Sequence, residues 1–144
     1  MITSLAILSI LIGFIVGLGA VTVIDIHGFL GRNSSYWTVA TTRTHKVTKP
    51  LIWIGTFFFA LGVLSLYEGQ LLLLQSLVLA VMILNGLFLS FRVSPHLLQK
   101  EKKGQDHELL SKNWQRYITL SFILSFISWW GSVVIFALYF LPTY

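Results

Sequence analysis

Four long apolar runs constrain the fold of this chain more than any other feature. They cover residues 2–24, 51–67, 71–91 and 118–141. A helix needs about 20 mostly apolar residues to cross the hydrocarbon core of a bilayer, so each run is long enough, with its flanking turns, to span it. The sequence therefore predicts one integral membrane domain over residues 1–144, folded as an all-α bundle of four transmembrane helices.

Composition supports this prediction and narrows the chemistry. Charged residues make up 10% of the chain, against about 25% in an ordinary soluble domain, and no segment between the runs is long enough to bury a soluble core. The absence of cysteine excludes disulfides, thiolate metal sites and a cysteine nucleophile. No phosphate-binding glycine loop, paired metal-ligand motif or Ser/His/Asp set is present. The sequence therefore predicts no catalytic residues and favours a non-enzymatic protein.

The basic residues predict the orientation in the membrane. All ten Lys and Arg residues lie in or beside the two connections that join the first run to the second and the third to the fourth. Because Lys and Arg near span ends are retained in the cytoplasm, these connections are predicted to be two basic cytoplasmic loops, with both termini outside. The expected partner of this basic face is a lipid bilayer with an anionic inner leaflet, and not nucleic acid.

Two stripes of small residues predict how the helices associate, since membrane helices pack through close backbone approach. The first and fourth runs carry them, as Ser9, Gly13, Gly17 and Ala20, and as Ser121, Ser125, Ser128 and Ser132. We predict that the first span packs against the fourth, and that the second and third close the bundle as a hairpin turning at residues 68–70. Alternatively, Gly13 and Gly17 form the contact of a homodimer.

The two basic connections are predicted to differ in structure. Residues 36–49 carry apolar side chains at helical spacing, so they form either an interfacial helix or an extension of the second span. Residues 94–115 begin with Ser94-Pro95 and include a run of charges, which favours a solvated loop.

Three histidines lie within a turn or two of the predicted span ends, namely His27, His45 and His96. Neutral imidazole is the commonest nitrogen ligand of metals and of haem iron, so these residues are candidate ligands of a haem or a metal at the cytoplasmic mouth of the bundle. The alternative is that they are ordinary interfacial residues, because no pair of histidines is spaced by four. The sequence does not specify which metal.

Two polar residues are predicted to face the interior of the bundle. Asp25 continues the spacing of four set by Gly13 and Gly17, and a carboxylate there needs a partner. Arg92, which shares a helical face with Asn85, is the expected one. This pair is either a structural clasp or a carboxylate site for a proton or a substrate. Asn85 lies inside the third run and is expected to hydrogen-bond to the serine stripe or to a tryptophan.

Trp129 and Trp130 fall in the middle of the fourth run, away from the headgroup level that tryptophan prefers. One interpretation is that one ring packs inward while the other meets lipid or a partner subunit. The other is that the pair lines a pocket for a planar ligand, such as haem b or a quinone. Trp53 lies near the predicted cytoplasmic boundary, as expected for a member of an aromatic belt.

Several short motifs together resemble a known family. They are the glycine-rich first span ending in Asp25, Arg43 before a second span that begins Trp53-Ile54-Gly55, the pair Asn85-Gly86, and Ser128-Trp129-Trp130-Gly131. The pattern resembles a family of small uncharacterised prokaryotic four-span membrane proteins and, more distantly, the copper-resistance D-type and haem-associated membrane oxidase bundles. This resemblance covers most of the chain and implies a protein of the prokaryotic cytoplasmic (inner) membrane.

Three hypotheses for function follow. The leading one is an accessory or scaffolding subunit of a larger membrane complex, which docks on other membrane subunits or on a second copy through lipid-exposed aromatic faces. The alternative is a redox protein that holds a haem or a metal through His27, His45 and His96, with a quinone near the two adjacent tryptophans. The third is a permease for small solutes or lipids, gated by Asp25 and Arg92.

Overall fold

The computed structural model describes residues 2–31, 33–105 and 107–141, and the regular elements within them are all helical. In chain order they are α1 (Ile2–Ile12), the π-helical η1 (Gly13–Leu18), α2 (Gly19–Gly31), α3 (Ser35–Leu66), α4 (Gly69–Phe88), the π-helical η2 (Leu89–Val93), α5 (Ser94–Lys102) and α6 (Lys112–Tyr139). Each π-helical segment continues the helices on either side, so the chain forms four long helices. By length and composition each can cross a membrane, which confirms the predicted all-α bundle.

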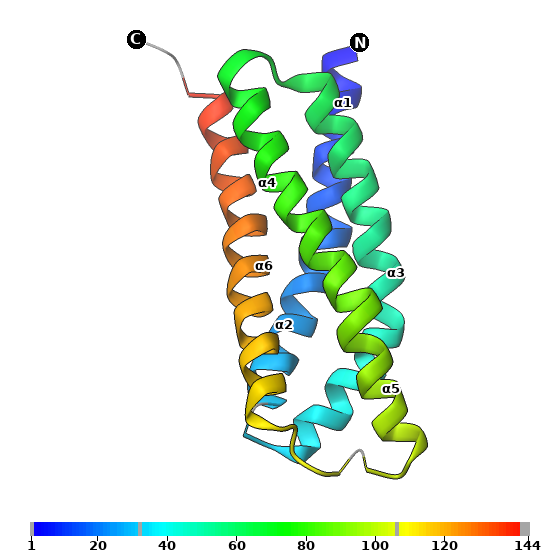
Figure 1. Cartoon of the computed structure of the whole chain (residues 1–144). Helices are drawn as coiled ribbons and strands as arrows, with labels where there is room; N and C mark the ends of the chain where they lie inside the picture. Colours follow the sequence, from blue (N-terminus) through cyan, green and yellow to red (C-terminus); the bar gives the residue numbers. More distant parts are fainter. Residues whose placement is uncertain (1, 32, 106, 142–144) are drawn as a thin grey trace.

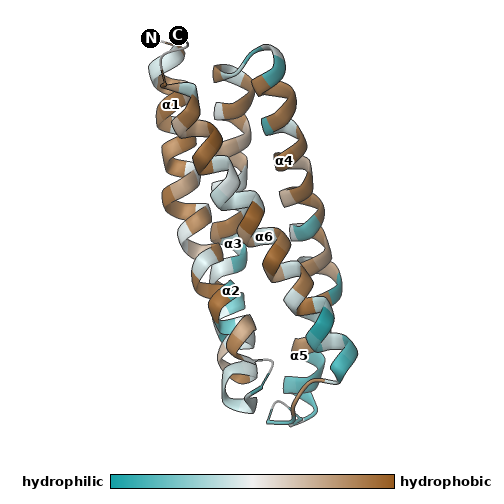
Figure 2. Cartoon of the chain, turned by 90° about the vertical axis from the view of Figure 1, so that its left-hand side faces the viewer, coloured by the Kyte–Doolittle hydropathy of each residue, from teal (hydrophilic) through white to brown (hydrophobic). Residues whose placement is uncertain are grey.

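The four helices run alternately up and down (Figure 1). The start of α1, the end of α6 and the turn between α3 and α4 lie at one end of the bundle, and the α2–α3 and α5–α6 connections lie at the other. Hydrophobic residues dominate most of the helix length, whereas hydrophilic residues gather around α5 and the adjoining part of α6 (Figure 2). The two basic connections therefore share one end of the bundle. That this end faces the cytoplasm stays a prediction.

At that end, the helices extend beyond the apolar runs. α3 begins at Ser35, so residues 36–49 extend the second span and do not form a separate interfacial helix. The third helix continues as far as Lys102, which corrects the prediction of a solvated loop over the whole of residues 94–115. Pro95 does not break it: the helix continues through the proline, which lies directly after the π-helical η2.

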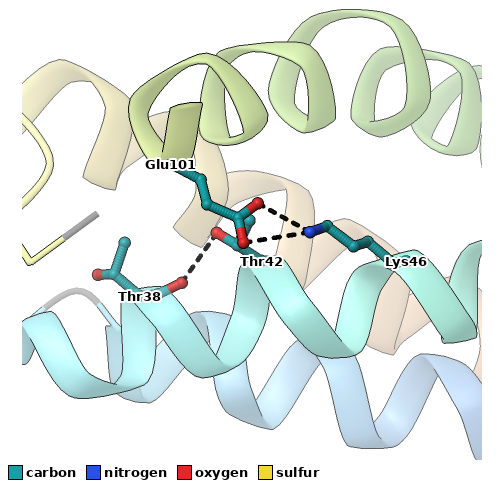
Figure 3. Close-up of polar contacts among 4 residues, drawn as sticks. All are labelled: Thr38, Thr42, Lys46 and Glu101. Atoms are coloured by element: carbon teal, nitrogen blue, oxygen red, sulfur yellow. Dashed lines mark hydrogen bonds and ion pairs between the residues drawn. The ribbon is translucent and has the colours of Figure 1, made fainter. Parts of the chain in front are cut away.

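An ion pair joins the extended parts of α3 and α5. Lys46 Nζ donates to both carboxylate oxygens of Glu101, at 3.1 and 2.8 Å (Figure 3). On the same stretch of α3 the Thr42 hydroxyl donates to the Thr38 carbonyl at 3.0 Å. Both charged side chains are partly exposed, so the pair is expected to contribute only about 0–1 kcal/mol. Its main effect is to fix α5 beside α3.

The first span packs against the second span, because α1, η1 and α2 all lie along α3. A Cβ atom added at Gly55 would overlap the backbone of Gly17, and one added at Gly13 would lie 2.7 Å from the Phe59 Cβ. A Cβ atom at Gly62 would lie 2.8 Å from the α1 backbone. The first span therefore packs mainly against the second span, whereas its predicted contact with the fourth span is present through α2, which lies along α6. Gly13 and Gly17 are buried within the chain, which removes the homodimer contact proposed for them.

The serine stripe of α6 faces α4, and these two helices form the second pair of the bundle. Gln75 Nε2 of α4 donates to the Ser132 carbonyl at 3.5 Å, and the Ser132 hydroxyl donates to the Ser128 carbonyl at 2.9 Å. Polar side chains therefore join α4 to α6, whereas glycines join the first span to α3. The predicted hairpin of the second and third spans is present, with Tyr67-Glu68 between α3 and α4.

Candidate functional site

A cavity lies between the four long helices, in the half of the bundle nearer the basic connections. The space open to the centres of water molecules is about 70 Å³, enough for on the order of five waters at about 15 Å³ each. Most of the wall is apolar, but residues from α2, α3, α4 and α6 bring polar and aromatic groups to it. These are Asp25, Thr41, His45, Trp53, Thr56, Asn85, Ser121, Ser125 and Trp129.

Asp25 of α2 is the acidic group of this wall, and only 7% of its surface is exposed. The Ser125 side chain of α6 is within hydrogen-bonding reach of its carboxyl group. The second carboxyl oxygen, Oδ2, is buried and has no hydrogen-bond partner in the described part of the chain. Asp25 thus faces the interior, as predicted.

Arg92 is not the partner of Asp25, which corrects the sequence-based prediction. Its side chain is exposed, and the ion pairs found among the described residues are Lys46 with Glu101 and Lys100 with Glu108. The reason is the π-helical η2, which begins four residues after Asn85. A π-helical turn holds one more residue than an α-helical turn, so a spacing of seven across η2 no longer keeps two residues on one face.

The structure does not bring the three candidate histidine ligands together. His45 lines the cavity, and its Nε2 is buried without a hydrogen-bond partner among the described residues. His27 instead places Nδ1 2.7 Å from the Val23 carbonyl, and the His96 ring stacks on Trp114 with centroids 3.9 Å apart. Within residues 2–31, 33–105 and 107–141, no three His, Asp or Glu side chains form a group that could hold a metal ion. The arrangement does not fit a haem held by two of these histidines.

Asn85 forms the hydrogen bonds that its position in the third span predicted. Its Nδ2 donates to the Ser121 carbonyl at 3.2 Å, and the Ser121 hydroxyl donates to Asn85 Oδ1 at 2.7 Å. This reciprocal pair joins α4 to α6 at the cavity wall. The prediction of a cross-helix hydrogen bond to the serine stripe is confirmed.

Trp129 and Trp130 point to opposite environments. Trp129 is 3% exposed, lies 5.9 Å from the Phe59 ring between centroids, and lines the cavity. Trp130 is 43% exposed and contacts Phe126 on the outer face. The two rings therefore do not form one pocket. The second indole of the cavity is Trp53, whose Nε1 donates to the Ser90 hydroxyl oxygen at 3.2 Å.

Sequence reasoning placed Asp25 in the interior but did not place His45, Trp53 or Thr56 around the same space. One signal was available. His45 lies five residues before Pro50 and eight before Trp53. If one helix runs without interruption through the proline, His45 and Trp53 lie on the same helix near the same end of the bundle. The sequence alone leaves open whether this segment is a separate helix.

The fold and the cavity together define a class of protein: a multi-pass, helical membrane protein with a cavity between its four spans, to which a few polar groups are exposed. Comparison of the chain with models of known protein families, with curated protein sequences and with solved structures finds no match. Any statement about its function therefore depends on the chemistry of the cavity.

Proposed function

We propose that this protein binds a small solute in the interhelical cavity, as a binding or permease protein of the membrane. The observation that carries the proposal is the Asp25 carboxyl group, which is buried at the cavity wall with Oδ2 unpartnered among the described residues. Removing a carboxylate from water costs several kcal/mol, and ionisable side chains inside membrane helices mark pathways for substrates, ions or protons. A purely structural carboxylate would be expected to have its hydrogen bonds filled.

The location we propose follows from the charges. Lys and Arg concentrate at the end of the bundle that carries the α2–α3 and α5–α6 connections, and positively charged loops are retained in the cytoplasm. The cavity then lies in the cytoplasmic half of the membrane. We therefore propose that both termini lie outside, and the resemblance of the short motifs is what supports the cytoplasmic membrane of a prokaryote.

Single cysteines test the proposal without background, because the chain has none of its own. Thr56 and Thr48 form a matched pair on α3. Each is 6% exposed, and each hydroxyl donates to the carbonyl four residues earlier. Of the two, Thr56 lines the cavity and Thr48 does not.

We expect methyl methanethiosulfonate, a small neutral reagent, to modify Thr56→Cys at least about tenfold faster than Thr48→Cys, because cavity water allows the thiol to ionise. The measurement is the modified fraction over time, by mass spectrometry of the protein in an uncharged detergent. Equal, slow modification of both variants would show that the cavity is closed to solutes and would end the proposal.

An accessory role in a larger complex is a second candidate, and the exposed ring of Trp130 favours it. Trp130 and Phe126 lie 6.0 Å apart between centroids and are both exposed, which gives a row of two rings on the outer face of α6. Tryptophan exposed at mid-span is away from the headgroup level it prefers. If this row binds another subunit, Trp130→Leu should abolish co-purification of that subunit from native membranes, while isolation as a monomer would count against it.

A redox cofactor is the alternative occupant of the cavity. Of its predicted binding residues, His45 and Trp129 line the cavity, while His27, His96 and Trp130 do not. An absorption spectrum of the protein from its native membrane, recorded oxidised and then reduced, separates the two proposals. A Soret band that shifts on reduction would favour haem b over a colourless solute.

A further inference from the structure

We propose that the solute bound in the cavity is a small organic cation that carries N–H donors, such as an alkylammonium ion. This inference rests on the proposed function, because it assumes that solutes reach the cavity. It comes from a comparison of the hydrogen-bond donors and acceptors that the described wall residues offer.

Three donors of the wall are already used within the protein. The Thr41 hydroxyl donates to the Trp37 carbonyl at 2.7 Å, and the Thr56 hydroxyl donates to the Ile52 carbonyl at 2.8 Å. A hydroxyl has one proton to donate, so neither threonine can donate to a solute without breaking its bond. The indole N–H of Trp53 donates to Ser90.

The same holds for the polar groups on the opposite wall. Asn85 and Ser121 bond to each other in both directions. The Ser125 side chain has the carboxyl group of Asp25 within reach. A solute that needs donors from the protein, such as a carboxylate, would therefore find few in this part of the wall.

Two polar atoms of the wall are left unused. Asp25 Oδ2 and His45 Nε2 are both buried, and neither has a hydrogen-bond partner among the described residues. An ionised carboxylate can only accept hydrogen bonds, and His Nε2 accepts when the ring proton is on Nδ1. The cavity therefore presents an open acceptor from Asp25 on α2, and a second one from His45 on α3 in that tautomer.

The charge of the wall points the same way. No Lys or Arg is among the described residues that line the cavity. Lys49, one turn beyond His45, places its Nζ 3.4 Å from the Ser90 carbonyl and 6.0 Å from the centre of the Phe91 ring, so it lies outside the wall, although its charge acts on the His45 ring. In a medium of low dielectric constant the ionised form of Asp25 favours a cation. The indoles of Trp53 and Trp129 add faces that attract cations.

Three probes of equal chain length test the inference, namely propylammonium, 1-propanol and propionate. Each is added to purified Thr56→Cys protein in an uncharged detergent, and the rate of modification by methyl methanethiosulfonate is measured. We expect propylammonium to halve this rate at a concentration at least about tenfold lower than 1-propanol, because a hydrogen bond to a charged group is stronger than one between neutral groups. Propionate should give no protection.

The control is the same comparison in Asp25→Asn combined with Thr56→Cys, where propylammonium should protect no better than 1-propanol. The three-probe comparison stands by itself if this variant does not fold. Three results would each overturn the cation inference while leaving an accessible cavity. They are equal protection by propylammonium and 1-propanol, strongest protection by propionate, and no protection by any probe. Failure of the reagent to reach Thr56→Cys at all would instead overturn the proposed function.

Discussion

Gly17 and Gly55 lie with their backbones in direct contact, and neither position has room for a side chain. A methyl group at Gly55 would overlap the Gly17 Cα and backbone nitrogen, which belong to η1. This contact lets the first span lie along α3 so closely that the Ser9 hydroxyl donates to the Phe58 carbonyl at 2.7 Å.

Gly55→Ala is therefore expected to lower the free energy of unfolding by about 1–3 kcal/mol, the usual effect of overpacking a tight contact. The measurement is unfolding in mixed micelles titrated with dodecyl sulfate. Gly131→Ala is the matched control, since a Cβ atom at Gly131 of α6 meets nothing within 4 Å. It should be neutral or stabilising by up to about 1 kcal/mol, because alanine favours the helix. Similar losses in both variants would contradict the close contact.

Asn85 and Ser121 should show a coupling energy of about 0.6–2 kcal/mol, the range found for hydrogen bonds between membrane helices. A double-mutant cycle with Asn85→Leu and Ser121→Ala measures it. The Ser121 backbone carbonyl accepts from Asn85 whether residue 121 is serine or alanine, so the cycle reports the bond between the two side chains. Strict additivity of the two single changes would show that this bond does not stabilise the bundle.

Replacing the carboxyl group of Asp25 is expected to preserve or raise stability. Asp25→Asn keeps the shape but removes a charge that is buried without an ionic partner in the described part of the chain, so the free energy of unfolding should stay level or rise by about 1 kcal/mol. Arg92→Ala should change it by less than about 0.5 kcal/mol. A large loss in Arg92→Ala would instead support the clasp that the sequence predicted.

Tyr67, which lies in the turn between α3 and α4, should titrate late. Burial, with the nearby Tyr139 as a smaller cause, raises the pKa of the Tyr67 phenol from its ordinary value of 10 to about 12. Because the neutral form is favoured in the folded state, its contribution to stability is full below pH 10 and is lost as the pH rises toward 12. Phenolate absorbance near 295 nm is measured over a pH titration of the native protein and of Tyr67→Phe. The variant should lack one component that ionises near pH 12 in the native protein. A lost component near pH 10 would show that the phenol is in water.

The sequence predicted the parts of the fold that depend only on the free-energy cost of placing a segment or a single side chain in the membrane. Apolar length alone determines whether a helix can cross a bilayer, so the four spans were placed correctly. An amide inside a span must find a hydrogen-bond partner, so the link from Asn85 to the serine stripe of α6 was foreseen. Neither argument needs the arrangement of the helices in space.

Helix pairing could not be obtained in the same way. A glycine stripe shows that something approaches closely, but it does not say which helix does. The matching surface on the second span is made by Gly55 and Gly62, which are seven residues apart and stand among bulky aromatic residues. The π-helical segment that contains Arg92 also has no clear sequence signal.

The two π-helical segments divide their helices into parts with different rotational phase. Each adds one residue to a turn. The direction in which a side chain of α2 or α5 points therefore depends on the extra residue in the π-helical segment before it. Deleting one residue within η1 would let this turn close as an ordinary α-helical turn, so the side chains of α2 would keep their faces and Asp25 would stay at the cavity. Deleting one residue within α2 before Asp25 would instead rotate Asp25 by about 100° and take it out of the cavity. The position of the extra residue, and not only the identity of the wall residues, thus determines which side chains the cavity receives.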